Sequence, residues 1–206
     1  MKRLAVMGSG NGSNFEEIVN WFQSKNIDNG IEITCLSDVE DALILKRAEK
    51  LGINCKYLPF EQNSEYFGEN KFDLVALAGY MRILPENVLK IMGKVINIHP
   101  SLLPSFKGKD AINKAFLSGV KLSGVTIHWA EKSVDEGKII AQYPVFIHNG
   151  MHLDEFEEQI HTIEHKLYPI VIEKVLEDKV FDFQDLIRGK GSGESSSCGG
   201  CGKCKH

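Results

Sequence analysis

The segment Val95–Pro100 (VINIHP) places an amide and an imidazole two residues apart at the end of an apolar run. In a β-strand, residues two apart point to the same face, so we expect Asn97 and His99 to project together. Pro100 cannot donate to a sheet and predicts the end of the strand. When an amine attacks a carbonyl carbon, an amide N–H and an imidazolium stabilise the developing negative charge. The pair therefore indicates acyl transfer, or else hydrogen bonds that anchor the Ser101–Pro104 turn.

A carboxylate beside His99 would favour the charged form of its ring. We expect Asp135 to supply this carboxylate, because its loop directly precedes a predicted strand. Glu131 and Glu136 flank it, and residue type alone does not separate these three acids. Asp135 could also serve only as a turn residue.

The loop Gly8–Asn14 (GSGNGSN) connects the first predicted strand to a helix. Its glycines and the N–H groups of the helix start are typical of an anion site. Ser13 and Glu16 have the spacing of a capping box. A dinucleotide fingerprint is a weaker interpretation, because Ser13 stands where a third glycine is expected and Asp38 is the sole acidic candidate for a ribose. A single phosphate monoester fits the loop better.

The residues around these motifs alternate between strand and helix patterns. The predicted strands are Arg3–Met7, Ile31–Ser37, Cys55–Leu58, Leu74–Ala78, Val95–His99, Gly124–Trp129 and Ile139–Tyr143. The predicted helices are Asn14–Ser24, Ala42–Leu51, Pro85–Met92, Ala111–Leu117 and Leu153–Glu177. Such alternation predicts an α/β fold with an open, mostly parallel twisted sheet and helices on both faces. Ligands of these sheets bind beyond the carboxyl ends of the strands, where the motifs above lie.

The chain has 206 residues, of which 43% are hydrophobic, enough for one domain over residues 1–188. Residues 189–206 (GKGSGESSSCGGCGKCKH) have the composition of a flexible tail. Three cysteines and a histidine in this tail have spacing that could hold a metal such as zinc, with a redox-sensitive tail as the alternative: Cys198, Cys201, Cys204 and His206.

The net charge of −4 argues against a nucleic-acid-binding surface. The apolar start of the chain is too short for a secretion signal, and no apolar run reaches the roughly 20 residues of a membrane span. We therefore expect a cytoplasmic protein that acts on small molecules, with reduced thiols at Cys35 and Cys55. The sequence specifies no oligomeric state.

Six motifs occur in a set order: GNGSN (10–14), GYMRIL (79–84), NIHPSLLP (97–104), GVTIH (124–128), VDEGKIIAQ (134–142) and EHKLYP (164–169). Together they resemble the phosphoribosylglycinamide formyltransferase family from Met1 to about Arg188. The resemblance implies a Rossmann-like formyltransferase fold. It also implies transfer of a formyl group from 10-formyltetrahydrofolate, a co-substrate, to the amine of 5-phosphoribosylglycinamide in de novo purine biosynthesis. No metal and no covalent enzyme intermediate are implied.

The resemblance also implies three groups of site residues. The catalytic group is Asn97, His99 as the proton donor, and Asp135 as the acid that keeps it charged. The substrate group is Gly12, Ser13, Asn14 and Glu164, the last near the amine. The folate group is Met81, Arg82, Ile83, Leu84 and Asn97, with residues 131–135 lining the same pocket.

The chain departs from this family at two internal places. The crossover Pro59–Asp73 is shorter than usual and rich in glutamate, so we assign no folate-binding residue to it. Lys138 stands where proline is frequent, which predicts a looser loop around Asp135.

Three other functions remain as alternatives: a formyltetrahydrofolate hydrolase, a formyltransferase acting on another amine (an aminoacyl-tRNA or a sugar nucleotide), and an NAD-type redox sensor.

Overall fold

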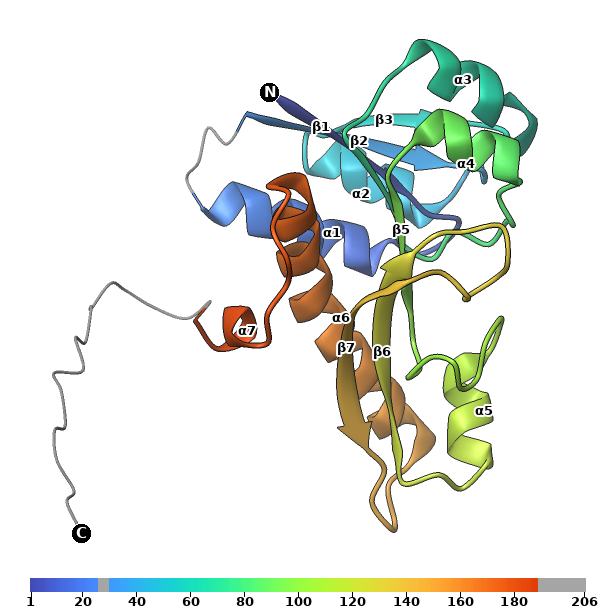
Figure 1. Cartoon of the computed structure of the whole chain (residues 1–206), viewed down its shortest axis with the longest axis vertical. Coiled ribbons are helices and arrows are strands. Elements are labelled where there is room, and N and C mark those ends of the chain that lie inside the picture. The colour runs from blue at the N-terminus through green and yellow to red at the C-terminus, as the bar shows by residue number, and fades with distance from the viewer. Residues whose placement is uncertain (26–29, 189–206) are drawn as a thin grey trace, which may run out of the picture.

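The computed structural model describes residues 1–25 and 30–188. Its centre is a seven-stranded sheet with the strand order β3-β2-β1-β4-β5-β6-β7 (Figure 1). The strands are β1 (Lys2–Met7), β2 (Ile31–Ser37), β3 (Asn54–Tyr57), β4 (Leu74–Leu77), β5 (Val95–His99), β6 (Leu122–Trp129) and β7 (Ile139–Phe146).

The first five strands pair in parallel, whereas β6 runs antiparallel to both β5 and β7. The predicted open, mostly parallel sheet is thus confirmed. The carboxyl ends of β1, β2, β4 and β5 open onto one edge of this sheet, where loops from distant parts of the sequence meet.

Helices cover both faces of the sheet, as predicted. They are α1 (Ser13–Ser24), α2 (Leu43–Lys50), the 3₁₀ turn η1 (Phe60–Gln62), α3 (Asn63–Glu69), α4 (Glu86–Met92), α5 (Ala111–Leu117), α6 (Leu153–Leu176) and α7 (Gln184–Arg188). The side chains of β1 point alternately to the helix layers on the two faces of the sheet. Leu4 and Val6 pack into the core under α1, α2, α5 and α6, whereas Ala5 and Met7 pack into the core under α3 and α4.

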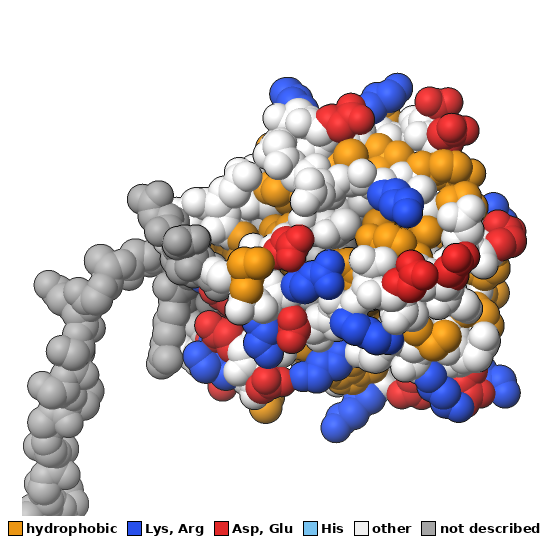
Figure 2. Space-filling model, turned by 90° about the horizontal axis from the view of Figure 1, so that it is seen from above, with side chains coloured by type: hydrophobic (Ala, Val, Ile, Leu, Met, Phe, Trp, Pro, Cys, Tyr) orange, Lys and Arg blue, Asp and Glu red, His pale blue; other side chains and the backbone are white. Residues whose placement is uncertain are grey.

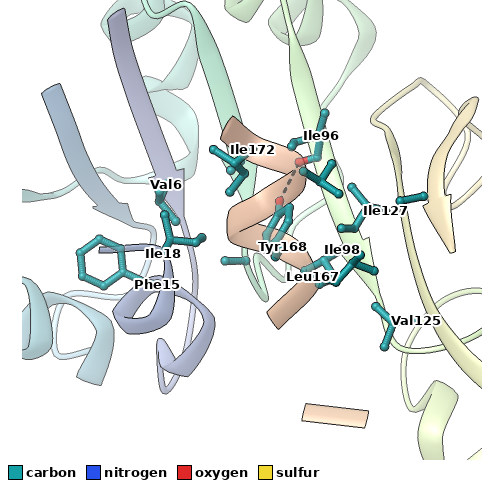
Figure 3. Close-up of a cluster of buried hydrophobic side chains, with 14 of the residues drawn as sticks. Val6, Phe15, Ile18, Ile96, Ile98, Val125, Ile127, Leu167, Tyr168 and Ile172 are labelled. Atoms are coloured by element: carbon teal, nitrogen blue, oxygen red, sulfur yellow. Dashed lines mark hydrogen bonds between the residues drawn. The ribbon is translucent and has the colours of Figure 1, made fainter. Parts of the chain in front are cut away.

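The helix α6 is anchored in the middle of the sheet by Tyr168, which is fully buried. Its hydroxyl donates to the carbonyl of Leu77 at 2.9 Å and lies 3.3 Å from that of Ile96. Figure 3 shows Tyr168 among the packed side chains of this core, including Ile18 and Leu167. The contact joins α6 to two neighbouring central strands, β4 and β5.

Two predictions about local structure were wrong. The capping box does not form: Gly12, not Ser13, caps α1, no side chain caps the helix, and Glu16 pairs with Arg47 on α2. The Pro59–Asp73 crossover, for which no helix was predicted, contains η1 and α3. Phe67 of α3 is buried there and supplies the apolar contact that the short helix needs.

None of the helices in the described part of the chain has the length and apolar composition needed to cross a bilayer. Seen from above, the surface carries lysine and arginine side chains interspersed with aspartate and glutamate (Figure 2). No single sign of charge dominates that face.

Candidate active site

A pocket of about 800 Å³ lies at the carboxyl edge of the sheet. Its walls come from the loops after β1, β4 and β5, from the loop before β7, and from α6. The residues that the resemblance assigns one by one to the catalytic, substrate and folate groups all line this pocket: Gly12, Ser13, Asn14, Met81, Arg82, Ile83, Leu84, Asn97, His99, Asp135 and Glu164. Of residues 131–135, all but Lys132 line it.

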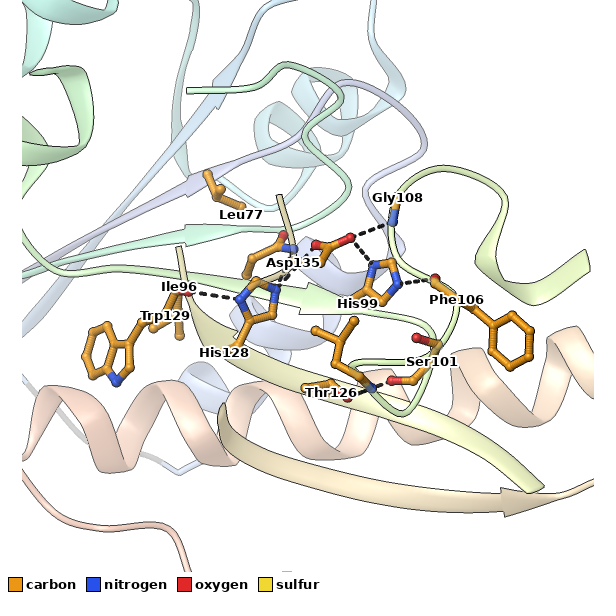
Figure 4. A network of polar contacts seen from close by, with 12 residues as sticks. Leu77, Ile96, His99, Ser101, Phe106, Gly108, Thr126, His128, Trp129 and Asp135 are labelled. Atoms are coloured by element: carbon orange, nitrogen blue, oxygen red, sulfur yellow. Dashed lines mark hydrogen bonds and ion pairs between the residues drawn. The ribbon is translucent and has the colours of Figure 1, made fainter. Parts of the chain in front are cut away.

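The imidazole of His99 is almost completely buried and held on both sides (Figure 4). Its Nδ1 lies 3.3 Å from Oδ2 of Asp135, and its Nε2 lies 2.9 Å from the carbonyl oxygen of Phe106. A carboxylate and a carbonyl only accept hydrogen bonds, so a ring that donates from both nitrogens satisfies both contacts. An imidazolium is the form of histidine that can do so.

Asp135, and neither neighbouring glutamate, is the acid that contacts His99. Its Oδ2 also accepts the Gly108 N–H at 2.7 Å, and its Oδ1 lies 3.5 Å from Nε2 of His128. Burial alone would raise the pKa of Asp135, but the contacts with His128, Gly108 and His99 outweigh it and lower the pKa below its usual value. Glu136 instead pairs with Lys107 at 2.8 Å.

The loop around Asp135 is fixed to β6 at its far end. A Cβ atom on Gly137 would lie 1.7 Å from the carbonyl oxygen of Trp129, so the backbones approach too closely for any other residue. The Trp129 N–H donates to the carbonyl of Lys138 at 3.0 Å. These contacts fix the end of the loop to β6, and the looser loop expected from Lys138 stays a prediction.

His128 is a pocket residue to which the sequence analysis assigned no role. It pairs in register with Asn97 across β5 and β6. Its Nδ1 lies 2.9 Å from the Trp129 carbonyl, and its Nε2 lies 3.2 Å from Nδ2 of Asn97. The Trp129 carbonyl accepts from Nδ1, and Nε2 lies between the amide of Asn97 and the carboxylate of Asp135. The motif GVTIH contained the signal, but the strand register that brings His128 to Asn97 is not readable from one sequence.

The loop Gly8–Asn14 begins α1 with Gly12 in a left-handed conformation (φ 77°). A Cβ atom on Gly12 would lie 2.6–2.7 Å from atoms of Ile44, so α2 packs directly on this turn. Arg47 on α2 also donates to the carbonyl and the side chain of Asn11, both at 2.9 Å. The loop is therefore braced from behind, and its front faces the pocket.

Glu164 joins α6 to this loop. Its Oε2 accepts from Nδ2 of Asn14 at 3.2 Å and lies 3.0 Å from Nδ1 of His161. The hydrogen bond with Glu164 raises the pKa of His161. A buried carboxylate thus lies beside a loop suited to an anion, which is an arrangement that can bind a phosphate and an ammonium group side by side.

The segment after β4 presents apolar side chains to the pocket. Met81 is 58% exposed and Ile83 is 67% exposed, and both line the pocket, so they offer apolar surface to a ligand. Leu84 also lines the pocket but is mostly buried in the core under α3 and α4. Arg82 pairs through Nε with Asp38 at 3.0 Å.

The remaining sequence predictions concern acids and cysteines. Asp38, the acidic candidate for a dinucleotide ribose, already binds Ser9 and Arg82 through its two oxygens. Burial raises the pKa of the Cys35 thiol to about 12, as expected for an unreactive core cysteine. The proposed metal ligands lie outside the described residues: Cys198, Cys201, Cys204 and His206.

Comparisons with known proteins agree with this geometry. Residues 2–172 match the family described as "Formyl transferase". The chain is 42% identical over 187 residues to a phosphoribosylglycinamide formyltransferase of Bacillus subtilis (strain 168), covering 85% of this chain and 95% of that protein.

Solved structures are similar as well. That of phosphoribosylglycinamide formyltransferase from Bacillus halodurans superposes with a TM-score of 0.78 at 34% identity, covering 85% of this chain and 95% of that one. That of glycinamide ribonucleotide transformylase 1 from Geobacillus kaustophilus gives a TM-score of 0.78 at 38% identity, covering 85% and 99%.

Proposed function

The chain belongs to the formyl transferase family, and from this premise we propose that it formylates the amine of 5-phosphoribosylglycinamide with 10-formyltetrahydrofolate. The observation that carries the proposal is the contact between His99 and Asp135 inside the pocket, with Asn97 beside them. The reaction is a step of de novo purine synthesis. Folate is its co-substrate.

The first step is attack of the substrate amine on the formyl carbon. A C–N bond forms, and the electrons of the C=O bond move to the oxygen. Nδ2 of Asn97 carries two N–H groups and lies 3.2 Å from Nε2 of His128 at the pocket. We assign this amide as the donor to the developing oxyanion, in a pocket where desolvation strengthens such a bond.

The second step breaks the bond between the formyl carbon and N10 of the folate, and N10 needs a proton. His99 is the proposed donor. Its Nδ1 faces Asp135, so Nε2 is the nitrogen that delivers the proton, and its hydrogen bond to Phe106 must give way to the substrate. As this bond breaks, the oxyanion re-forms the C=O bond, and the proton that the amine loses passes to the ring of His99, which has just released one. The products are a formamide and tetrahydrofolate.

Two further sets of pocket residues would orient the two substrates. We assign the ribose phosphate to Gly12, Ser13 and Asn14 at the start of α1, and the amine to the region of Glu164. We assign the folate to the segment Met81–Leu84, whose exposed apolar side chains suit an aromatic ring system.

The decisive experiment supplies purified protein with 10-formyltetrahydrofolate and either includes or omits phosphoribosylglycinamide. Release of tetrahydrofolate that depends on the amine is the expected result. Release of tetrahydrofolate in the absence of the amine would show that the protein is a hydrolase and would overturn the proposal. Transfer to another amine, in parallel reactions with aminoacyl-tRNA or an amino sugar nucleotide, would change the substrate but not the chemistry.

We further propose that the reaction takes place in the cytoplasm, with small molecules as the partners and with no nucleic acid or membrane involved. The net charge of −4 and the mixed charges in Figure 2 support this proposal.

A further inference from the structure

One group of contacts beside the pocket joins the loops that follow β1, β2 and β4. Ser9 Oγ donates to Asp38 at 2.5 Å and accepts the Met81 N–H at 2.9 Å, while Arg82 Nε donates to the other oxygen of Asp38 at 3.0 Å. We propose that Asp38 is a positioning residue for the formyl donor, because through Ser9 and Arg82 it fixes the segment assigned to the folate. The inference rests on the proposed function and adds a residue to it.

The sheet order explains how these residues meet. The strands β2, β1 and β4 are neighbours, so their carboxyl ends place Asp38, Ser9 and the segment from Gly79 side by side. Ser9 binds this segment twice, since its N–H also donates to the Gly79 carbonyl at 3.0 Å. The orientation of the Ser9 hydroxyl is set by Asp38, which accepts its proton and leaves the oxygen free to accept from Met81.

Burial makes Asp38 a rigid anchor. Its side chain is only 2% exposed, whereas that of Arg82 is 59% exposed. An exposed arginine ordinarily samples many rotamers. Here the carboxylate holds Nε, and the ring of Phe60 lies 5.9 Å from the guanidinium carbon. Arg82 is therefore held at the rim of the pocket before any ligand binds.

Asp38 itself does not line the pocket, although Met81 and Arg82 do. Its role is therefore indirect. A dinucleotide ribose would need a carboxylate with a free acceptor facing the ligand, but both oxygens of Asp38 are engaged by the protein. The acid singled out in the sequence thus serves the folate side of the pocket.

Two variants and a matched control test this role. Asp38→Asn removes the charge and keeps the shape, and Ser9→Ala removes the link to Met81 while sparing the pair with Arg82. The control is Asp41→Asn, the same change at an exposed acid in the same loop. For each protein, kcat, the KM for each substrate and the melting temperature are measured, together with the Kd for tetrahydrofolate by calorimetry under nitrogen.

We expect the KM for 10-formyltetrahydrofolate and the Kd for tetrahydrofolate to rise about tenfold in Asp38→Asn, the effect of weakening a hydrogen bond to a charged group. Ser9→Ala should change them in the same direction. The KM for phosphoribosylglycinamide and kcat should stay near wild type, because the loop Gly8–Asn14 remains braced by α2 through Arg47. Asp41→Asn should match wild type throughout.

A purely structural role would lower the active fraction, so that kcat falls in both variants while the KM and Kd for the folates do not change. That result would overturn the inference, as would unchanged values throughout. Should Asp38→Asn fail to fold, Ser9→Ala decides alone. A wild-type protein that neither turns over nor binds tetrahydrofolate would count against the proposed function. An active wild type with unaltered variants counts against Asp38 only.

Discussion

The two hydrogen-bond acceptors around His99 define its chemistry at the scale of a single residue. A neutral imidazole has one donor nitrogen, so it would leave either Asp135 or Phe106 facing a lone pair. Phe106 occupies Nε2, the nitrogen that must release the proton in the proposed reaction. Substrate binding has to replace a backbone carbonyl with the leaving nitrogen of the folate.

Replacement of His99 by alanine removes this donor. We expect kcat to fall by about two to four orders of magnitude, the usual contribution of a general acid or base. The melting temperature should show that the variant is folded. His148→Ala is the matched control, because His148 also pairs with a carboxylate, that of Glu155 at 3.4 Å, but lies outside this pocket. Near-normal turnover of the His99 variant would rule out its proposed role.

The pH dependence of the reaction tests Asp135. The lowered pKa of this carboxyl keeps it ionised at neutral pH, where its negative charge favours the charged ring of His99. In Asp135→Asn that charge is lost, and the amide no longer favours the charged form of the ring. The alkaline limb of the pH–rate profile should therefore move to lower pH. Glu136→Gln should leave the profile in place, and the opposite pattern would assign the role to Glu136.

At the scale of the element, strands and helices with strong local signals were predicted well. Val95–His99 and Ile31–Ser37 have the predicted bounds, since apolar β-branched residues fill each run and Pro100 follows the first. The strand β7 continues to Phe146 rather than Tyr143, through Pro144, which an edge strand tolerates. The helix α3 was missed because its stability comes from tertiary packing of Phe67 and not from its polar sequence.

The candidate site was predictable only in part for a related reason. A strand pattern shows that Asn97 and His99 share a face, and the loop sequence offers three acids. Which acid reaches the ring depends on the backbone at Asp135, where φ is 54°. The partnership of Asn97 with His128 depends on the register between β5 and β6. Both are properties of the assembled sheet.

The turn before α1 gives a prediction for one glycine. Gly12→Ala places a Cβ atom against Ile44 and in a left-handed conformation. The conformation alone costs roughly 1–2 kcal/mol, so the free energy of unfolding in urea should fall by at least that amount. Gly10→Ala in the same loop has no atom within 4 Å of the new Cβ and should cost less. If the two variants lost the same free energy of unfolding, the contact of Gly12 with α2 would not explain why glycine is needed there.

Tyr168, which anchors α6 to the sheet, gives a second prediction about stability. Tyr168→Phe removes a buried hydroxyl that donates to the Leu77 carbonyl. We expect a loss of about 0.5–1.5 kcal/mol in the free energy of unfolding, the net value of a typical hydrogen bond. Tyr57→Phe on the exposed edge strand β3 is the control and should have almost no effect. If the two changes were equal, the hydroxyl of Tyr168 would not contribute to the attachment of the helix.

At the scale of the whole molecule, the pocket uses only part of the chain. Every residue that lines it falls between Gly10 and Glu164. The described residues after Glu164 contribute contacts within the fold. One of these is the ion pair between Lys174 on α6 and Asp185 on α7 at 2.8 Å. We therefore expect residues 1–188 to contain everything that the catalytic and binding residues need.

The last prediction concerns the cysteine-rich residues 189–206. A chain that ends at Arg188 retains α7 and its pair with Lys174, so it should fold with the pocket intact. We expect its kcat and both KM values to stay close to those of the full chain. The full chain with Cys198, Cys201 and Cys204 replaced by serine should behave alike, because every residue assigned to catalysis or substrate binding lies between Gly10 and Glu164. Formyl transfer that collapses in both proteins while the melting temperature holds would mean that these cysteines take part in the reaction. Collapse in the truncated chain alone would assign the effect to another part of residues 189–206.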